Sequence, residues 1–312
     1  MILNAGQLSR RDFLSSSALL FLAASMPGDA ADAGNVEPII DIHQHTNYAF
    51  RTNEQLIAHQ RAMGVALTVL QPAGRIYGLE ASCGGNQTVL DLAKEHSREF
   101  VFFANEVADI EEAREEIEAF LKRGAIGIGE QKFRVECDSK YFERIAEIAQ
   151  EFDVPILMHF QHGTYNTGIE RFHKILEKYP RVNFIGHAQT WWGNIDKNHD
   201  QPVMYPKGPV TAGGITDRLL SDYPNMYGDH SAGSGLNAMT RDEEHACGFI
   251  ERHQNKLMFG SDCDDRIGHG PECQGAQILA ALRRLAPSKA IERKILYENA
   301  KRVLKLKIKT SR

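Results

Sequence analysis

Several histidines and carboxylates of this 312-residue sequence directly follow short apolar runs. His43 and His45 form a His-x-His pair at the end of one run, and His159, His187 and Asp262 end three others. Successive side chains of a β-strand point to opposite faces, so the imidazoles of His43 and His45 can bind one metal ion together. Imidazole and carboxylate are ligands for zinc, and also for manganese, iron, cobalt or nickel. The pattern predicts a centre for one or two divalent ions, with zinc as the first choice.

The same alternation makes a prediction about the rest of this first strand. Ile39, Asp41, His43 and His45 should share one of its faces. Asp41 should then point inward one layer below His43, where it would hydrogen-bond a ligand imidazole or pair with a lysine. Taken alone, the His-x-His pair has a plainer interpretation as two polar residues at a strand end.

Apolar runs rich in β-branched residues alternate with amphipathic stretches from residue 38 onward. Near-continuous apolar runs are typical of parallel strands covered by helices. Eight strands, each followed by a helix, predict an α/β fold: a single (β/α)8 TIM barrel over residues 34–312 with a C-terminal helical extension. A doubly wound open sheet is the alternative, but it requires a glycine-rich turn after the first strand. The runs are residues 38–45, 65–71, 100–107, 125–133, 154–159, 182–187, 225–229 and 256–262, and the main helical stretches are 53–63, 88–97, 110–122, 139–152, 169–179 and 241–253.

The barrel interpretation predicts where functional residues lie. In such barrels they stand at the C-terminal ends of the strands, which form one rim. Besides the residues named above, Glu130 and Lys132 end the fourth run, and Asp229 and His230 end the seventh. All of these side chains should therefore meet at a single mouth of the barrel.

Charge and cysteine content argue against several classes of protein. The net charge is −5 and no basic stripe is present, so a nucleic-acid partner is not expected. The five cysteines are scattered without a Cys-x-x-Cys pair, which argues against a thiolate zinc site and against a disulfide-dense fold. Cys263 and Cys273 could form a bridge in an oxidising compartment, or all five cysteines could be ordinary small residues.

The first 33 residues resemble a twin-arginine signal peptide. Residues 9–14 match the pattern Ser-Arg-Arg-x-Phe-Leu, and a short apolar segment and an Ala-x-Ala sequence follow. This segment is too short and too rich in serine to span a bilayer, and we expect no membrane span in the mature chain. The resemblance implies a cleavable leader, a partner in the twin-arginine export machinery, a metal loaded before export and a periplasmic location.

Five ordered segments resemble the amidohydrolase superfamily, and its amidohydrolase-related branch in particular. They are residues 43–45, 155–159, 184–187, 259–262 and 295–300, and the resemblance covers essentially all of the mature chain. It implies that Asp262 handles the proton of the attacking water and that His187 binds a second metal or polarises the substrate. The metal ligands that it implies are His43, His45, His159 and Asp262.

Glu130 and Lys132 stand where two-metal members of the superfamily place a bridging carboxylated lysine or glutamate. Glu130 could fill this role, as in the deoxyribonuclease-like branch. We favour it as a ligand because a carboxylate at a barrel mouth requires a partner. Lys132 shares its face, so a salt bridge with Glu130 or a contact with the substrate is the competing interpretation.

Residues on the loops at the predicted mouth are candidates for binding a small-molecule substrate. Trp191 and Trp192 open a long loop over residues 190–209, where they could cover the pocket or anchor the loop. His162 lies just past the fifth run, with opposite parity to His159. The candidates are His162, Lys132, Trp191, Trp192, Arg75 and His230.

The residues and the resemblance together predict a periplasmic, metal-dependent hydrolase. It would cleave an ester, lactone or amide bond of a small molecule through a metal-activated water. A non-oxidative decarboxylase is the first alternative, because the same branch contains such lyases with the same metal ligands. A metal-binding or sensory protein without turnover is the second. A homo-oligomer is one open possibility for the assembly.

Overall fold

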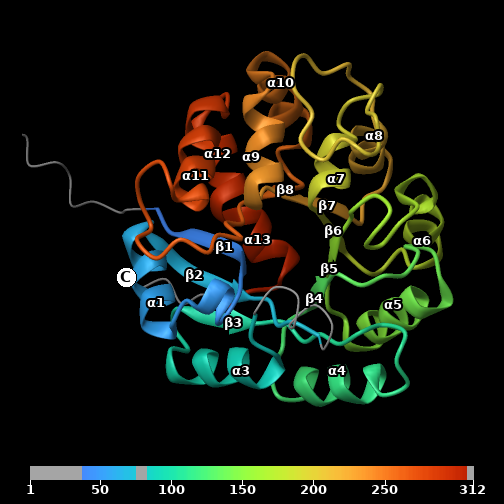
Figure 1. Ribbon diagram of the computed structural model, residues 1–312, viewed down its shortest axis with the longest axis vertical. Helices are drawn as coiled ribbons and strands as arrows, with labels where there is room; N and C mark the ends of the chain where they lie inside the picture. The colour runs from blue at the N-terminus through green and yellow to red at the C-terminus, as the bar shows by residue number, and fades with distance from the viewer. Residues whose placement is uncertain (1–36, 75–82, 308–312) are drawn as a thin grey trace, which may run out of the picture. The chain divides into compact units, whose positions relative to one another are not determined.

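The computed structural model describes residues 37–74 and 83–307, and in this part of the chain parallel strands follow one another in order around a ring (Figure 1). Each of the eight predicted apolar runs contains one strand, which confirms the predicted order. The strands are β1 (Ile39–Gln44), β2 (Val65–Leu70), β3 (Phe100–Phe102), β4 (Ile128–Gln131), β5 (Ile156–His159), β6 (Phe184–His187), β7 (Met226–Asp229) and β8 (Leu257–Met258).

Two sheets, β1-β2-β3 and β4-β5-β6-β7-β8, close into the barrel through short contacts at their junctions. Ala104, just past β3, forms a parallel bridge with Ile128 of β4. At the other junction the amide of Ile42 donates to the carbonyl of Phe259 at 3.1 Å, and the amide of Asp262 donates to the carbonyl of His43 at 2.8 Å. The predicted (β/α)8 barrel is therefore confirmed, with its C-terminal strand ends on one rim.

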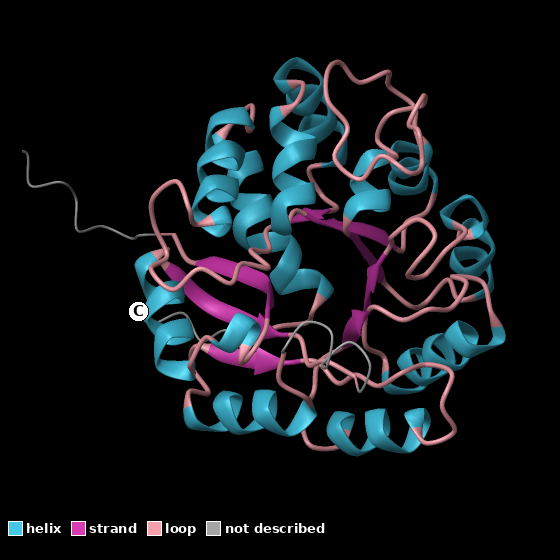
Figure 2. Cartoon of the chain, in the orientation of Figure 1, coloured by secondary structure: helices cyan, strands magenta, loops and turns pink. Residues whose placement is uncertain are grey.

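Helices surround the ring on its outer side (Figure 2). Thr52 caps the N-terminus of helix α1 with a capping box. Its side chain accepts a hydrogen bond from the backbone amide of Gln55, and the Gln55 side chain accepts one from the backbone amide of Thr52. The predicted helix over residues 169–179 is divided into a 3-10 turn and a shorter α-helix. The described helices and 3-10 turns, from the first to the one that follows β8, are η1 (Tyr48–Phe50), α1 (Asn53–Ala62), α3 (Asn86–Glu95), α4 (Ala113–Leu121), α5 (Lys140–Phe152), η2 (Ile169–Arg171), α6 (His173–Lys178), α7 (Gln189–Gly193), α8 (Ile215–Asp222), α9 (Ala232–Thr240), α10 (Glu243–His253) and α11 (Gln274–Leu285).

The C-terminal helical extension is also confirmed, and it closes the end of the barrel opposite the functional rim. It consists of α12 (Lys289–Arg293), a π-helical turn η3 (Lys294–Glu298) and α13 (Asn299–Val303). Tyr297 and Val303 pack in one buried cluster with the barrel residues Ile40, Leu157 and Met258. No described helix is long and apolar enough to cross a membrane.

Strand β1 departs from regular alternation just before its metal-facing end. Ile40 and Ile42 face the inner cluster, whereas Asp41 accepts a hydrogen bond from Gln60 of the covering helix α1 at 3.1 Å. The pairing of β1 with β2 shifts register between Asp41 and Gln44. Such an irregularity reverses the faces of the residues that follow it. The prediction that Asp41 points inward below His43 is therefore wrong.

Candidate metal centre

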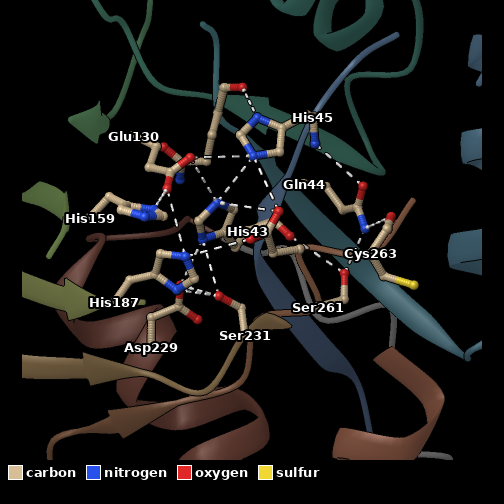
Figure 3. A network of polar contacts seen from close by, with 12 residues as sticks. His43, Gln44, His45, Glu130, His159, His187, Asp229, Ser231, Ser261 and Cys263 are labelled. Carbon is tan, nitrogen blue, oxygen red and sulfur yellow. Dashed lines mark hydrogen bonds and ion pairs between the residues drawn. The ribbon is translucent and has the colours of Figure 1, made fainter. Parts of the chain in front are cut away.

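Imidazoles and carboxylates from five different strand ends converge at the rim (Figure 3). Their ligand atoms include two groups with no residue in common, and within each group the atoms lie no more than 4.8 Å from one another. The residues predicted from sequence as metal ligands are thus brought together. One group is His43, His45 and Asp262, and the other is Glu130, His159 and His187.

The inner nitrogens of the first group face each other and the oxygens of the neighbouring carboxylates. Nε2 of His43 lies 3.2 Å from Nε2 of His45 and 3.9 Å from Oδ1 of Asp262. The same oxygen of Asp262 lies 3.4 Å from Nε2 of His45. Two ligands that each lie about 2.1 Å from a tetrahedral ion are about 3.4 Å apart, so this spacing fits a divalent cation.

Glu130 reaches both groups. Its Oε1 lies 2.5 Å from Nδ1 of His159 and 3.6 Å from Nε2 of His187. Its Oε2 lies 3.5 Å from Nε2 of His45 and 3.6 Å from Nε2 of His43. One carboxylate therefore stands between the two groups, as a bridging ligand would.

The outer nitrogens of three imidazoles are held by groups behind the rings. Nδ1 of His43 lies 2.7 Å from the Asp229 carboxylate, and Nδ1 of His45 lies 2.8 Å from the carbonyl of Gln71. Nδ1 of His187 lies 2.8 Å from the hydroxyl of Ser231. Partners of this kind fix the orientation of a ligand imidazole and leave its other nitrogen for the metal.

Two buried oxygens of the cluster have no hydrogen-bond partner among the described residues: Oε2 of Glu130 and Oδ1 of Asp262. Leaving a buried carboxylate oxygen without a donor is costly, and a cation would remove that cost. The donor set, its spacing and these two oxygens all fit a divalent metal ion. Asp262 also has a left-handed backbone conformation with φ of 41°, a kind of strain that concentrates at functional sites.

The imidazoles of the cluster lower the pKa values of its two carboxyl groups. Burial opposes ionisation of Glu130, but the imidazoles of His159 and His43 hold its pKa well below the usual range. Burial acts in the same way on Asp262, and His43 followed by His187 and His45 lowers its pKa well below the usual range. Both groups are therefore anionic at neutral pH, the form that binds a cation.

The imidazoles respond differently to the same burial. Burial lowers the pKa of His159 to about 4, against the opposing effect of Glu130. Burial also disfavours a charged His43, yet the carboxylates of Asp262, Asp229 and Glu130 raise its pKa well above the usual value. His43 is thus protonated when no metal is present, whereas His159 is neutral.

Trp191, Trp192 and His230 lie in the core rather than over a pocket. Trp191 is fully buried and only 2% of Trp192 is exposed. Trp192 donates to the carbonyl of Asp229 at 2.9 Å and stacks on His230, with ring centroids 4.4 Å apart. Burial lowers the pKa of His230 to about 3, so this ring is neutral. Other side chains enclose all three residues, and a contact between them and a substrate stays a prediction.

Asp229 reaches the rim from behind the cluster. Its side chain is fully buried and faces His43, so it supports a ligand rather than a substrate. Gly260 makes this contact possible, because a Cβ at that position would lie 2.2 Å from Oδ1 of Asp229. No motif in the sequence signals the pairing, since the two partners of the hydrogen bond are 186 positions apart.

The remaining substrate-binding candidates lie at or beyond the rim. His162 lines a cavity of about 590 Å³ together with Gln161 and Thr190. Lys132 lies with its ammonium 5.5 Å from the centroid of the Tyr165 ring, and Arg134 lies at the same distance from that ring. Arg75 is outside the described residues.

Tyr48 is a rim residue that the sequence reasoning missed. Its ring lies edge-on to His45 with centroids 5.1 Å apart. The negative charge of Asp262 and then burial raise its pKa, so the phenol remains a neutral donor. Its position three residues after His45, in the turn η1 (Tyr48–Phe50), was the available signal.

Comparisons with known proteins place this geometry in context. A family model described as Amidohydrolase matches residues 40–306. A search of curated proteins found no match.

Solved structures of low sequence identity share the fold. An uncharacterised TIM-barrel protein from Bordetella bronchiseptica has a TM-score of 0.62 and 15% identity over 86% of this chain and 99% of that chain. A probable 2-pyrone-4,6-dicarboxylic acid hydrolase from Acinetobacter baumannii, with citric acid bound, has a TM-score of 0.58 and 13% identity. The match covers 86% of this chain and 100% of that chain. A 2,6-dihydroxybenzoate decarboxylase from Rhizobium has a TM-score of 0.55 and 14% identity over 86% and 99%.

Proposed function

The chain belongs to the amidohydrolase family, as its motifs predicted, and from this premise we propose that it is a hydrolase dependent on two divalent metal ions. The bond that it cleaves would be an ester, lactone or amide bond of a small molecule. The observation that carries the proposal is the position of Glu130, whose two carboxylate oxygens face the two groups of imidazoles separately. Paired ions that share a carboxylate are characteristic of hydrolytic centres.

The protein's own groups would hold and move protons around the reacting carbonyl. When bound, the ions would polarise that carbonyl and supply a nucleophile from water at neutral pH. Asp262 is anionic and its Oδ1 has no hydrogen-bond partner among the described residues, so this oxygen can accept the proton of the attacking water. Tyr48, whose ring lies edge-on to that of His45, would donate a hydrogen bond to the negative charge that develops on the substrate.

Positive charge beside the centre favours a substrate that carries a carboxylate. Lys132 and Arg134 both lie against Tyr165, whose ring is 5.6 Å from that of His159. Their charges would attract an anionic group, and the aromatic ring offers a flat apolar surface beside it. A lactone or amide with a free carboxylate is therefore the substrate class that we favour. Zinc is the first candidate for the metal because imidazole and carboxylate ligands suit it.

The same charged and aromatic group also suits the second candidate function, a non-oxidative decarboxylase. Such an enzyme would place a carboxylated ring against Tyr165 and break a C–C bond. Structural neighbours include both a probable hydrolase and a decarboxylase, so the shared fold does not separate the two reactions. The centre's imidazoles and carboxylates are compatible with either.

Isotope-labelled water distinguishes these reactions directly. Purified protein is incubated with lactones, amides and carboxylated aromatic acids in water enriched in oxygen-18. Hydrolysis should place one labelled oxygen in the new carboxylate and release no carbon dioxide. Carbon dioxide in equal amount to product, with a solvent proton where the carboxylate had been, would overturn the hydrolase proposal and establish a lyase.

Variant proteins test whether any turnover belongs to this centre. Asp262→Asn removes the proton acceptor, and the oxygen-18 signal should fall to background. Lys174→Gln changes a cation on helix α6 that lies 3.7 Å from Asp138, away from the centre, and should leave the rate unchanged. No turnover in the unchanged protein with bound metal, over the whole substrate panel, would favour a metal-binding protein instead.

The first 33 residues lie outside the described part of the chain, and we propose that they direct export by the twin-arginine route. The Arg10-Arg11 pair within Ser-Arg-Arg-x-Phe-Leu supports this proposal. Replacing both arginines with lysine should hold the precursor in the cytoplasm, uncleaved, when the cells are fractionated. Unchanged periplasmic recovery of the lysine variant would contradict it.

A further inference from the structure

A second group of metal-binding side chains lies behind the candidate centre, between helix α1 and the segment that follows Asp262. It contains His59, Cys263 and Cys273, and their ligand atoms all lie within 4.8 Å of one another. His59 and Cys273 are fully buried, and only 2% of Cys263 is exposed. None of these three residues belongs to the imidazole and carboxylate cluster at the rim.

The sulfur and nitrogen atoms are spaced as ligands of one ion would be. The two sulfurs lie 3.9 Å apart, and Sγ of Cys273 lies 3.4 Å from Nε2 of His59. For zinc–sulfur bonds of about 2.3 Å and zinc–nitrogen bonds of about 2.0 Å, tetrahedral geometry gives separations of about 3.8 Å between sulfurs and about 3.5 Å between sulfur and nitrogen. Both observed separations agree with these values within about 0.2 Å.

A carboxylate lies near the imidazole, but outside the group of mutually close ligand atoms. Oδ2 of Asp265 lies 3.8 Å from Nε2 of His59. The backbone amides of Ile267 and Gly268 donate to the same oxygen at 2.8 and 2.7 Å, which holds the carboxylate in place. Gly268 has φ of +83°, and a Cβ there would lie 2.3 Å from the carbonyl of His59, so only glycine lets this turn approach α1 so closely.

The buried imidazole has no other polar role in the described structure. Nδ1 of His59 has no hydrogen-bond partner among the described residues, and Nε2 faces only the thiols and the Asp265 carboxylate. A buried histidine with so few partners is costly, and coordination through Nε2 would offset that cost. The scattered cysteines argued against a thiolate zinc site, but the fold brings two of them together.

We propose that His59, Cys263 and Cys273 bind one zinc ion, separate from the metal centre at the rim. The ion would join α1 to the N-terminal end of α11, where Cys273 is the capping residue. Two thiolates and one imidazole supply three of the four ligands of a tetrahedral ion, and a water molecule would complete the set.

This site would also fix the segment that carries Asp262. Cys263 follows Asp262 directly, and its carbonyl accepts hydrogen bonds from Arg51 at 2.8 Å and from Gln44 at 2.9 Å. Arg51 donates to the carbonyl of Asp265 as well, at 2.8 Å. A rigid anchor immediately behind Asp262 would keep its carboxylate directed at the neighbouring imidazoles.

Cobalt substitution tests the proposal on the unchanged protein. The full chain is stripped of metal under reducing conditions, reloaded with cobalt(II), and its near-ultraviolet absorption is recorded. Thiolate ligands produce an intense sulfur-to-cobalt charge-transfer band, whereas the imidazole and carboxylate centre contains no sulfur ligand. The band should be present, and its absence would overturn the proposal.

Cysteine variants locate the band. The Cys263→Ser/Cys273→Ser double variant should lose it together with one bound ion per chain, and the Cys83→Ser control should keep both. Metal still bound at the rim, together with an unchanged circular dichroism spectrum, would show that the double variant is folded. A band that survives in the double variant would refute the assignment.

Thiol titration separates the site from a disulfide. Protein purified without reductant is denatured in the presence of a chelator, and its reactive thiols are counted. The proposal expects all five cysteines to react. Two missing thiols that return after reduction would show a Cys263–Cys273 bridge in place of the zinc site.

Discussion

The carboxylate of Asp229 lies 2.7 Å from Nδ1 of His43, on the side of the ring that faces away from the metal ligands. This contact, fully buried at both ends, selects the nitrogen of His43 that is left to face the other ligands. Ser231 extends it, since its hydroxyl donates to Asp229 at 2.7 Å and lies 2.8 Å from Nδ1 of His187. One carboxylate behind the cluster thus orients ligands from two strands.

Replacing Asp229 by asparagine should therefore weaken metal binding without removing a ligand. We expect the apparent metal affinity to fall by about 10- to 100-fold, as for other partners of ligand histidines. The matched control is Asp217→Asn, which alters another buried aspartate that contacts a histidine, His253, at 2.6 Å. Chelator competition measures both variants, and equal affinities would show that the Asp229 contact does not orient the ligand.

Gly260→Ala should disturb the same contact by steric means. The added Cβ would lie 2.2 Å from Oδ1 of Asp229 and 3.0 Å from Cβ of His43. We expect a loss of about 1–3 kcal/mol in the free energy of unfolding together with weaker metal binding. Gly248→Ala is the control, because its nearest neighbour would be 3.5 Å away and it lies inside helix α10. Denaturant unfolding that shows no difference between the two variants would contradict the packing argument.

The two groups of ligands should respond separately to the loss of one histidine. His159→Ala should remove one of the two ions proposed at the rim, because His43, His45 and Asp262 remain to hold the other. Glu130→Gln should weaken both positions, since its oxygens face both groups. His162→Ala, at the neighbouring rim position, should retain both ions. Elemental analysis after dialysis measures the metal content of each variant. An unchanged metal content in Glu130→Gln would show that Glu130 is not a ligand.

Metal affinity should rise with pH through the neutral range. Asp262, Asp229 and Glu130 raise the pKa of His43 above its usual value, so metal binding must displace its proton. Lower proton concentration therefore favours binding, by up to about tenfold per pH unit until the pKa of His43 is passed. His159, with a pKa of about 4, is already neutral and adds no slope. Competition titrations at several pH values measure the slope, and a flat profile from about pH 6 to pH 8 would contradict this assignment.

Tyr48→Phe should slow turnover without changing metal content. The phenol faces His45 and is kept protonated by the charge of Asp262 and by burial. If it stabilises developing charge on the substrate, its removal should lower kcat by about 100-fold or more, with a smaller change in KM. Tyr205→Phe, on an exposed segment, is the control. Equal kcat values for the two variants would exclude this role.

Local sequence patterns predicted the fold and most residues of the candidate centre. Eight apolar runs separated by amphipathic stretches specify a parallel barrel, and the C-terminal ends of its strands necessarily meet at one rim. The rim positions of His159 and His187 follow from that rule, because each ends a regular strand. The role of Glu130 beside them came from the family resemblance, and its position between both groups agrees with it.

Only the tertiary structure decided which side chains support the ligands and which lie in the core. Alternation failed for Asp41 because a register shift before Gln44 reverses the faces of β1. Trp191 and Trp192 are buried because helix α7 packs against the barrel. The indole N–H of Trp192 donates there to the carbonyl of Asp229, the last residue of β7. The partners of His43 and of Cys273 lie 186 and 214 positions away in the chain. Contacts over such separations depend on how the strands and helices pack, and a periodic local pattern carries no information about them.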